Sequence, residues 1–250
     1  MTRTLVLIAG VSAGLAAFCF ILASALGGQE LLHGNWHRSW RVHDGSIIVG
    51  HDFTPDPDGG GPAETRAIAW SGAEGLDVDI PADITFTQAP APGKLTITGP
   101  KGTVDQIEAS GEAIEYRDQP INPQRVKIVM TAPDVRRFSL SGDETLSLSG
   151  YSQDDLDIDV SGAGKVTGQG KARTVRLDVS GLGDADLGKL TSKEARVSIS
   201  GSGHSTVAPT DTADIDISGA GEVVLATRPA TVHSDVSGMG RVVEGGTTFR

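Results

Sequence analysis

Five copies of a Ser-Gly-x-Gly motif recur at nearly equal intervals in the last 90 residues of this 250-residue chain. The serines of successive copies are 19, 20, 18 and 19 residues apart. A period that steady is typical of a stacked structural repeat rather than of a catalytic domain. The motif residues are Ser161, Gly162, Gly164, Ser180, Gly181, Gly183, Ser200, Gly201, Gly203, Ser218, Gly219, Gly221, Ser237, Gly238 and Gly240.

The residues before each serine alternate between apolar and polar. In the first copy Leu156, Ile158 and Val160 precede Ser161, and a second short alternation resumes after the turn at Val166. This period of two predicts strands with one buried face and one solvated face. The polar column nearest the turn reads Asp159, Asp178, Ser198, Asp216 and Asp235.

The turns predict a parallel β-solenoid with one coil per repeat. Equivalent positions recur in the same chain direction, and stacked coils would lie about 4.7 to 4.9 Å apart. Glycine suits a corner that needs positive φ and close approach of the next coil. Ser141-Gly142, Ser110-Gly111 and Thr98-Gly99 resemble eroded copies, so residues 76–245 would hold roughly nine coils of ~19 residues. An antiparallel sandwich or a propeller is the alternative architecture.

A family resemblance adds to this interpretation. The Ser-Gly-x-Gly series, together with segments 94–100 (KLTITGP) and 129–135 (VMTAPDV), is similar to the bacterial family called the putative auto-transporter adhesin, head GIN domain. The resemblance covers approximately residues 65–245. It implies an all-β fold, a right-handed, single-stranded parallel β-helix in the cell envelope, and it brings no catalytic residues with it.

The N-terminus predicts export. Residues 4–28 form an uncharged and mostly apolar run after Arg3, long enough to span a bilayer. Ala23-Ser24-Ala25 offers a cleavage site. We expect a signal anchor or signal peptide at 1–28, a flexible juxtamembrane linker at 29–64 and a β-helix head domain at 65–250. The head would face the periplasm from the inner membrane, or be periplasmic or secreted after cleavage. Cys19 is interpreted as one more apolar residue of the span.

Composition restricts the partners. The net charge is -11 and only 4% of residues are aromatic, which argues against nucleic acid as a partner. Stacking would bring carboxylates of the polar column to about one strand spacing, where a divalent cation such as calcium could bind. The alternative is that they are solvated and balanced by Arg176 and Arg196 in the adjacent column. These weak metal candidates are Asp159, Asp178, Asp216 and Asp235.

The linker holds a second weak metal candidate. His33 and His37 are spaced as i, i+4, and on a helix both could ligate zinc or copper. The favoured interpretation is interfacial, with Trp36 and Trp40 at the level of lipid headgroups.

No catalytic motif is found. The segments 162–165 (GAGK) and 168–171 (GQGK) lack the spacing of phosphate-binding loops, and the repeated serines have no histidine at a fixed offset. We therefore expect no enzyme and no cofactor, but a non-enzymatic, adhesin-like envelope scaffold that presents a polar surface to an envelope protein or glycan. The alternatives are a cation-binding structural module using the aspartate ladder and a carbohydrate-active β-helix enzyme.

Overall fold

The structure is a computed structural model that describes residues 41–43, 46–48, 62–70, 72–118 and 122–245. The chain divides into two compact units, residues 1–55 and 56–250. In the first, β1 (Arg41–His43) and β2 (Ser46–Ile48) form an antiparallel pair inside the predicted linker. The predicted anchor or signal at 1–28 lies outside the described residues. Among the residues that are described, no helix is long and apolar enough to cross a membrane.

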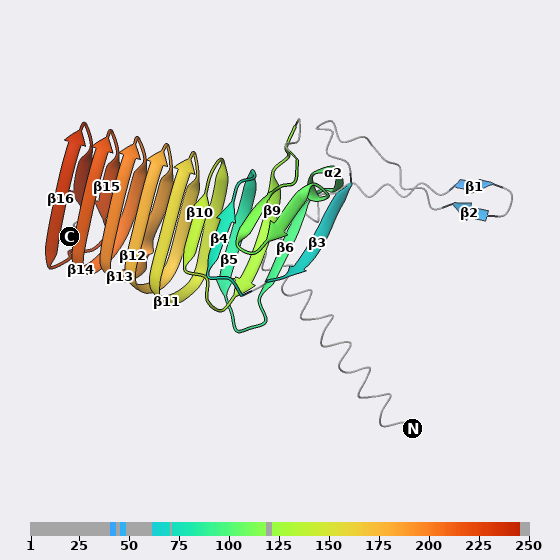
Figure 1. Ribbon diagram of the computed structural model, residues 1–250, viewed down its shortest axis with the longest axis horizontal. Helices are drawn as coiled ribbons and strands as arrows, with labels where there is room; N and C mark the ends of the chain where they lie inside the picture. The colour runs from blue at the N-terminus through green and yellow to red at the C-terminus, as the bar shows by residue number, and fades with distance from the viewer. Residues whose placement is uncertain (1–40, 44–45, 49–61, 71, 119–121, 246–250) are drawn as a thin grey trace, which may run out of the picture. The chain divides into compact units, whose positions relative to one another are not determined.

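The second unit is an all-β solenoid of about five turns, as the repeat predicts (Figure 1). The serines of the five motifs stand in register on neighbouring strands, and every pairing among these strands is parallel. This finding excludes the sandwich and the propeller, while the right-handed winding stays a prediction. The strands that form the regular stack are β11 (Glu144–Gly162), β12 (Lys165–Gly181), β13 (Asp184–Gly201), β14 (His204–Gly219), β15 (Glu222–Leu225), β16 (Thr231–Gly238) and β17 (Arg241–Glu244).

Each turn of the solenoid contributes to two walls. The leading wall holds the segments before each Ser-Gly-x-Gly corner, ending at β16, and the trailing wall holds the segments after it, ending at β17. The long strands β11 to β14 run from the trailing wall into the leading wall, so each of them belongs to both. We call the bend between the two segments of such a strand the far corner.

The N-terminal part of the unit is built differently. Antiparallel pairs occur here, because β6 pairs with β3 and β9, and β7 pairs with β8. The strand β4 lies between β8 and β10, and β5 lies between β9 and β11. The level formed by β4 and β5, the inserted level, therefore lies between the level of β8 and β9 and the level of β10 and β11, although both of these follow it in sequence. The elements are β3 (Ala63–Ala69), β4 (Gly75–Val78), β5 (Ala82–Gln88), β6 (Lys94–Pro100), α2 (Lys101–Val104), β7 (Ile107–Ser110), β8 (Ala113–Tyr116), β9 (Val126–Ala132) and β10 (Arg137–Leu140).

This arrangement corrects the expectation of roughly nine regular coils. Thr98 and Gly99 lie within the antiparallel strand β6, and Ser110-Gly111 makes the turn between β7 and β8, where Gly111 has φ 62°. Only Ser141-Gly142 belongs to the stack, because the carbonyl oxygen of Gly142 accepts a hydrogen bond from Ala163 in the next corner. The other two dipeptides match the motif by composition and not by position.

The core fills the space between the two walls. The predicted inward columns are buried through β14, with Val160, Val179, Ile199 and Ile217 each at most 2% exposed. An aromatic cluster joins the inserted level to the regular stack: the rings of Phe86 and Phe138 meet edge to face at 5.2 Å, and Tyr151 lies 6.5 Å from Phe86. Burial of large rings contributes much of the hydrophobic stabilisation where the strand order changes.

Candidate ligand-binding groove

The Ser-Gly-x-Gly corners are tight turns that hold the stacked strands together. The first glycine of every motif has positive φ, from 118° at Gly238 to 145° at Gly201. A Cβ at Gly162 would stand 2.7 Å from the carbonyl oxygen of Gly142. A Cβ at the second glycine, Gly164, would stand 2.8 Å from Val160 Cγ1. One glycine is therefore required by backbone conformation and the other by side-chain packing.

The motif serines are exposed at the ends of the leading-wall strands. The one nearby histidine in the repeats, His204, places Nδ1 3.5 Å from Asp184 and makes no hydrogen bond with Ser200. Exposed serines without a base are not activated nucleophiles. The corners consequently supply geometry and no recognisable chemistry.

The aspartate column falls into two separate pairs. Asp159 stands beside Asp178 in register, and Asp216 stands beside Asp235, while Ser198 separates the pairs. Partial desolvation, together with the neighbouring Asp178 carboxylate, raises the pKa of Asp159. Within the described residues no group of three or more His, Cys, Asp or Glu side chains converges as a metal ion would require. Of the linker histidines, His33, His37 and His51 lie outside the described residues, and nothing is described of the side chain of His43.

The neighbouring column on the same outward face, four residues before each motif serine, contains both charges. Arg176 reaches Asp157 at 3.4 Å, and Arg196 reaches Asp214 at 3.3 Å. Such exposed ion pairs contribute about 0 to 1 kcal/mol each. Their effect is to neutralise this part of the leading wall.

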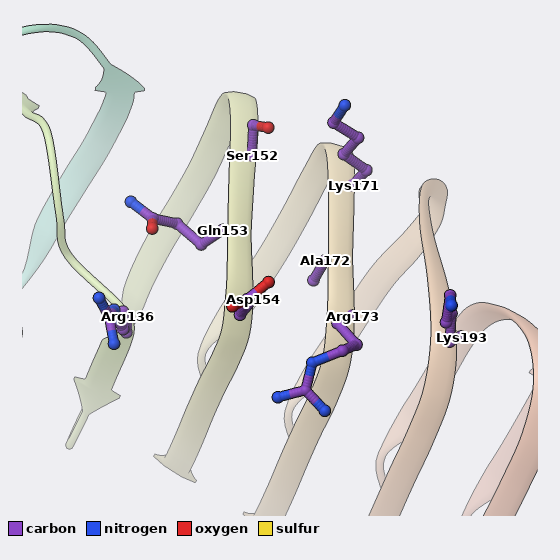
Figure 2. Close-up of a pocket in the computed structure, with 8 residues that line it drawn as sticks. All are labelled: Arg136, Ser152, Gln153, Asp154, Lys171, Ala172, Arg173 and Lys193. Carbon is purple, nitrogen blue, oxygen red and sulfur yellow. The ribbon is translucent and has the colours of Figure 1, made fainter.

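A groove of about 520 Å³ lies at the far corner of the solenoid (Figure 2). Its walls come from four successive levels of the stack, and the levels are about 4.7 to 4.9 Å apart. Figure 2 shows Lys171 and Arg173 projecting from β12 on either side of Ala172, with Asp154 on the neighbouring strand β11. The lining residues are Arg136, Ser152, Gln153, Asp154, Lys171, Ala172, Arg173 and Lys193.

The groove is basic although the chain as a whole is acidic. Four of its eight lining residues are cationic and one is anionic. Arg136 is held by Asp134 at 2.8 Å, and Arg173 reaches Asp155 only at 3.5 Å. Lys171 and Lys193 are exposed and form no ion pair with any described residue. These two ammonium groups are therefore available to an anionic ligand.

Sequence reasoning missed this groove. In the sequence, Lys171 belongs only to the segment 168–171, which lacks the spacing of a phosphate-binding loop. The other three cations of the groove belong to no column that stays cationic in every copy of the motif. The reason is structural: bulges shift the register between Leu148 and Tyr151, and again between Thr167 and Gln169, so alignment on the serines does not align the far corner. One signal was present in the sequence, since 7 of the 21 Lys and Arg residues lie between positions 165 and 196.

A second open groove, of about 670 Å³, crosses the leading wall near its last strand. It contains the three carboxylates of Asp214, Asp216 and Asp235 but only one guanidinium, that of Arg196. The excess of carboxylates makes this groove unsuitable for an anionic ligand. The far-corner groove is thus the better candidate for binding an anion.

A family model for the putative auto-transporter adhesin, head GIN domain, matches residues 74–229. No curated protein matches the chain. Among solved structures, a putative adhesin from Bacteroides fragilis NCTC 9343 is 21% identical with a TM-score of 0.60, over 76% of this chain and 98% of the other. That likeness shows a shared fold. A putative lipid binding protein from Parabacteroides distasonis ATCC 8503 is 16% identical with a TM-score of 0.46, over 74% of this chain and 98% of its own.

Proposed function

Because the chain belongs to the putative auto-transporter adhesin, head GIN domain family, we propose that it is a non-enzymatic, adhesin-like envelope scaffold that binds an acidic glycan in the far-corner groove. The observation that carries the proposal is a cluster of four cations on a chain of net charge -11. Two of those cations, Lys171 and Lys193, lack an ion-pair partner among the described residues.

The spacing of the cations favours a linear polyanion. They come from three of the four levels that line the groove, the level of β11 contributing no cation. Because levels are about 4.7 to 4.9 Å apart, an extended chain lying along the solenoid axis could place an anionic group near each of these three levels. The groove is open and shallow, which admits a polymer that continues beyond both ends. Carboxylate and sulfate groups on a glycan would accept charge-assisted hydrogen bonds from the lysines and from Arg173.

The composition of the groove argues against the other partner classes. A protein interface depends on apolar and aromatic anchors, and Ala172 is the only apolar residue in the lining. Neutral glycans and single-stranded nucleic acids depend on aromatic stacking, which this lining does not offer. Ser152 and Gln153 can still bond sugar hydroxyls, although the Nε2 of Gln153 already donates to the carbonyl oxygen of Pro133 at 2.7 Å.

The same lining supports a binding role rather than catalysis. Glycosidase chemistry needs two carboxyl groups that flank the scissile bond, and Asp154 is the only carboxylate in the groove. The family name and the apolar run at residues 4–28 support the further proposal that the solenoid works outside the cytoplasm, either anchored in the inner membrane and facing the periplasm or released after cleavage.

The test is salt-dependent binding of the full chain to polygalacturonate, with dextran as the neutral comparison and single-stranded DNA as a second polyanion. The variant Lys171→Glu/Lys193→Glu should weaken polygalacturonate binding roughly tenfold or more, because two attractions become repulsions. Dextran should not bind.

The matched control is Lys127→Glu/Lys165→Glu, which changes the net charge equally at two exposed lysines outside the groove. It should retain most of the affinity. Equal losses in both variants would show that only net charge matters, and equal binding of dextran would remove the acidic class. Stronger binding of DNA than of polygalacturonate would replace the glycan by a nucleic acid.

A further inference from the structure

The last turn of the solenoid leaves one edge of each wall unpaired. Among the described residues, β16 pairs only with β14 and β17 pairs only with β15. Each strand therefore presents a row of backbone N–H and C=O groups on its outer edge. Such an edge is a template for pairing with another strand.

The same turn also exposes large apolar side chains, one of which, Val236, lies in a column that earlier turns bury. Val236 is 39% exposed, whereas its counterparts in the column, such as Val160, are at most 2% exposed. Val243 is 36% exposed and Met239 is 86% exposed. Three of the four exposed large hydrophobic residues in the described part of the chain thus belong to this one turn. An edge that is both unpaired and apolar favours strand addition over solvation.

The sequence of β16 is complementary to itself when it is read antiparallel. From Thr231 to Ser237 it reads Thr-Val-His-Ser-Asp-Val-Ser, which is chemically symmetric about Ser234. We infer that β16 pairs antiparallel with β16 of a second copy of this chain, around a two-fold axis at Ser234. Each His233 would then face Asp235 of the other copy, and each Val232 would face Val236.

This pairing satisfies both properties of the edge. The backbone groups of the two β16 strands bond each other, and the half-buried Val232 and the exposed Val236 pack across the strands. The His233 imidazole can donate a hydrogen bond to the Asp235 carboxylate on each side of the axis. A two-fold interface of this kind is closed, so association stops at two copies.

The leading-wall strands β14 and β12 lack either this complementarity or a free edge. The equivalent segment of β14 would set Asp214 against Asp216 of a second copy, which is repulsive. The segment of β12 would place Arg176 opposite Asp178 of a second copy, which is attractive. Both edges of β12 are, however, already paired within the chain. Only β16 combines the pattern with an available edge among the described strands.

The inference goes beyond the proposed function, because it concerns a different surface. A tail-to-tail dimer carries two far-corner grooves, which would increase the avidity for a polymer without any new contact to the ligand.

The experiment is cysteine crosslinking of the purified full chain in mild detergent. In a Cys19→Ala background, Ser234→Cys brings two thiols to directly opposite positions, and mild oxidation should give a covalent dimer. The matched control is Ser202→Cys, at an exposed residue in the Ser-Gly-x-Gly corner of an earlier turn, and this variant should stay monomeric. A Ser234→Cys chain that stays monomeric with a freely reactive thiol would overturn the inference. A monomer whose thiol is protected would assign the edge to another segment of the same chain, and equal crosslinking of both variants would indicate random collision.

A charge exchange tests the register. His233→Asp sets like charges opposite each other at two symmetric places and should weaken dimerisation roughly tenfold, measured by sedimentation velocity. His233→Asp/Asp235→His restores the complement and should restore the dimer. Both residues are exposed, so circular dichroism should show an unchanged fold. If the double exchange fails to rescue the dimer, the Ser234-centred register is wrong.

Discussion

The two parts of the solenoid use the same parallel stacking but reach it by different routes. From Gly142 to Gly240 the chain adds one level after another in sequence order, and a pair of glycines turns every corner after the first. From Ala63 to Leu140 it places β4 and β5 between levels that come later, and it closes this end with antiparallel strands. The C-terminal end has no such closure among the described strands.

The difference shows what periodicity requires. A repeat is visible in sequence only where each level contacts its neighbours in chain order, because every level then needs the same corner and the same inward columns. An inserted level contacts residues far away in sequence. Its side chains have to fit only that one place in the core, so they need not resemble those of any other level. Phe86, Phe138 and Tyr151 meet where the two parts join, and their packing is unlike that of any regular level.

The largest expected effect comes from breaking that junction. Phe138→Ala removes a fully buried ring and should lower the free energy of unfolding by about 3 to 5 kcal/mol. Because the ring couples the inserted level to the first regular level, we expect the two parts to unfold separately. Trp70 fluorescence would report the N-terminal part in a Trp36→Phe/Trp40→Phe background, and far-ultraviolet circular dichroism would report mainly the regular stack.

Leu177→Ala is the control within the regular stack. Leu177 is equally buried, so the substitution should cost about 2 to 5 kcal/mol while both signals still change together. Coincident transitions for Phe138→Ala as well would show that the two parts remain coupled without the aromatic cluster.

The second prediction compares glycines in the two parts. Gly201→Ala should destabilise the fold by roughly 2 to 4 kcal/mol, because φ is 145° and the new Cβ would strike the carbonyl oxygen of Gly181. Gly111→Ala, with φ 62° and open space around the Cβ, should cost roughly 1 to 2 kcal/mol. Gly102→Ala in α2 should be neutral or slightly stabilising. Thermal melting would give the order, and equal losses at Gly201 and Gly111 would refute the steric part of the argument.

The regular part of the fold was predictable from sequence for a physical reason. Val160 and its counterparts repeat because one inward column runs through consecutive levels, and Gly162 repeats because each corner crosses the one below. The inserted level was not predictable, since nothing in residues 75–88 indicates that β10 and β11 will pair with them. Handedness and the N-terminal segment at 1–28 stay predictions.

The candidate site was predictable only in part. The adjacency of Asp159 and Asp178 follows from the repeat, because both residues stand two places before a motif serine. The groove does not follow, because Lys171 and Lys193 sit at the far corner, where bulges change the number of residues between one level and the next. Convergence there depends on local register, which serine spacing does not determine.

The smallest expected effect concerns Glu144, which occupies the corner position that Gly164 and its counterparts hold in later levels. Its side chain is 1% exposed, Oε2 accepts a hydrogen bond from the Gly142 N–H at 2.8 Å, and Oε1 has no partner among the described residues. Burial raises the pKa of this carboxyl above its ordinary value near 4.5, and the nearby Asp79 and Asp143 carboxylates raise it further.

The native state therefore binds the Glu144 proton more tightly than the unfolded state does. That contribution to stability is complete below about pH 4.5 and is lost as the pH rises through the raised native pKa. Glu144→Gln should remove this loss, so the stability of the variant should fall less than that of the parent between pH 4.5 and neutrality in urea titrations. Asp143→Asn, an exposed neighbour, should leave most of that fall in place. If the two variants flatten the pH profile equally, the effect comes from general repulsion among the corner carboxylates and not from the buried oxygen of Glu144.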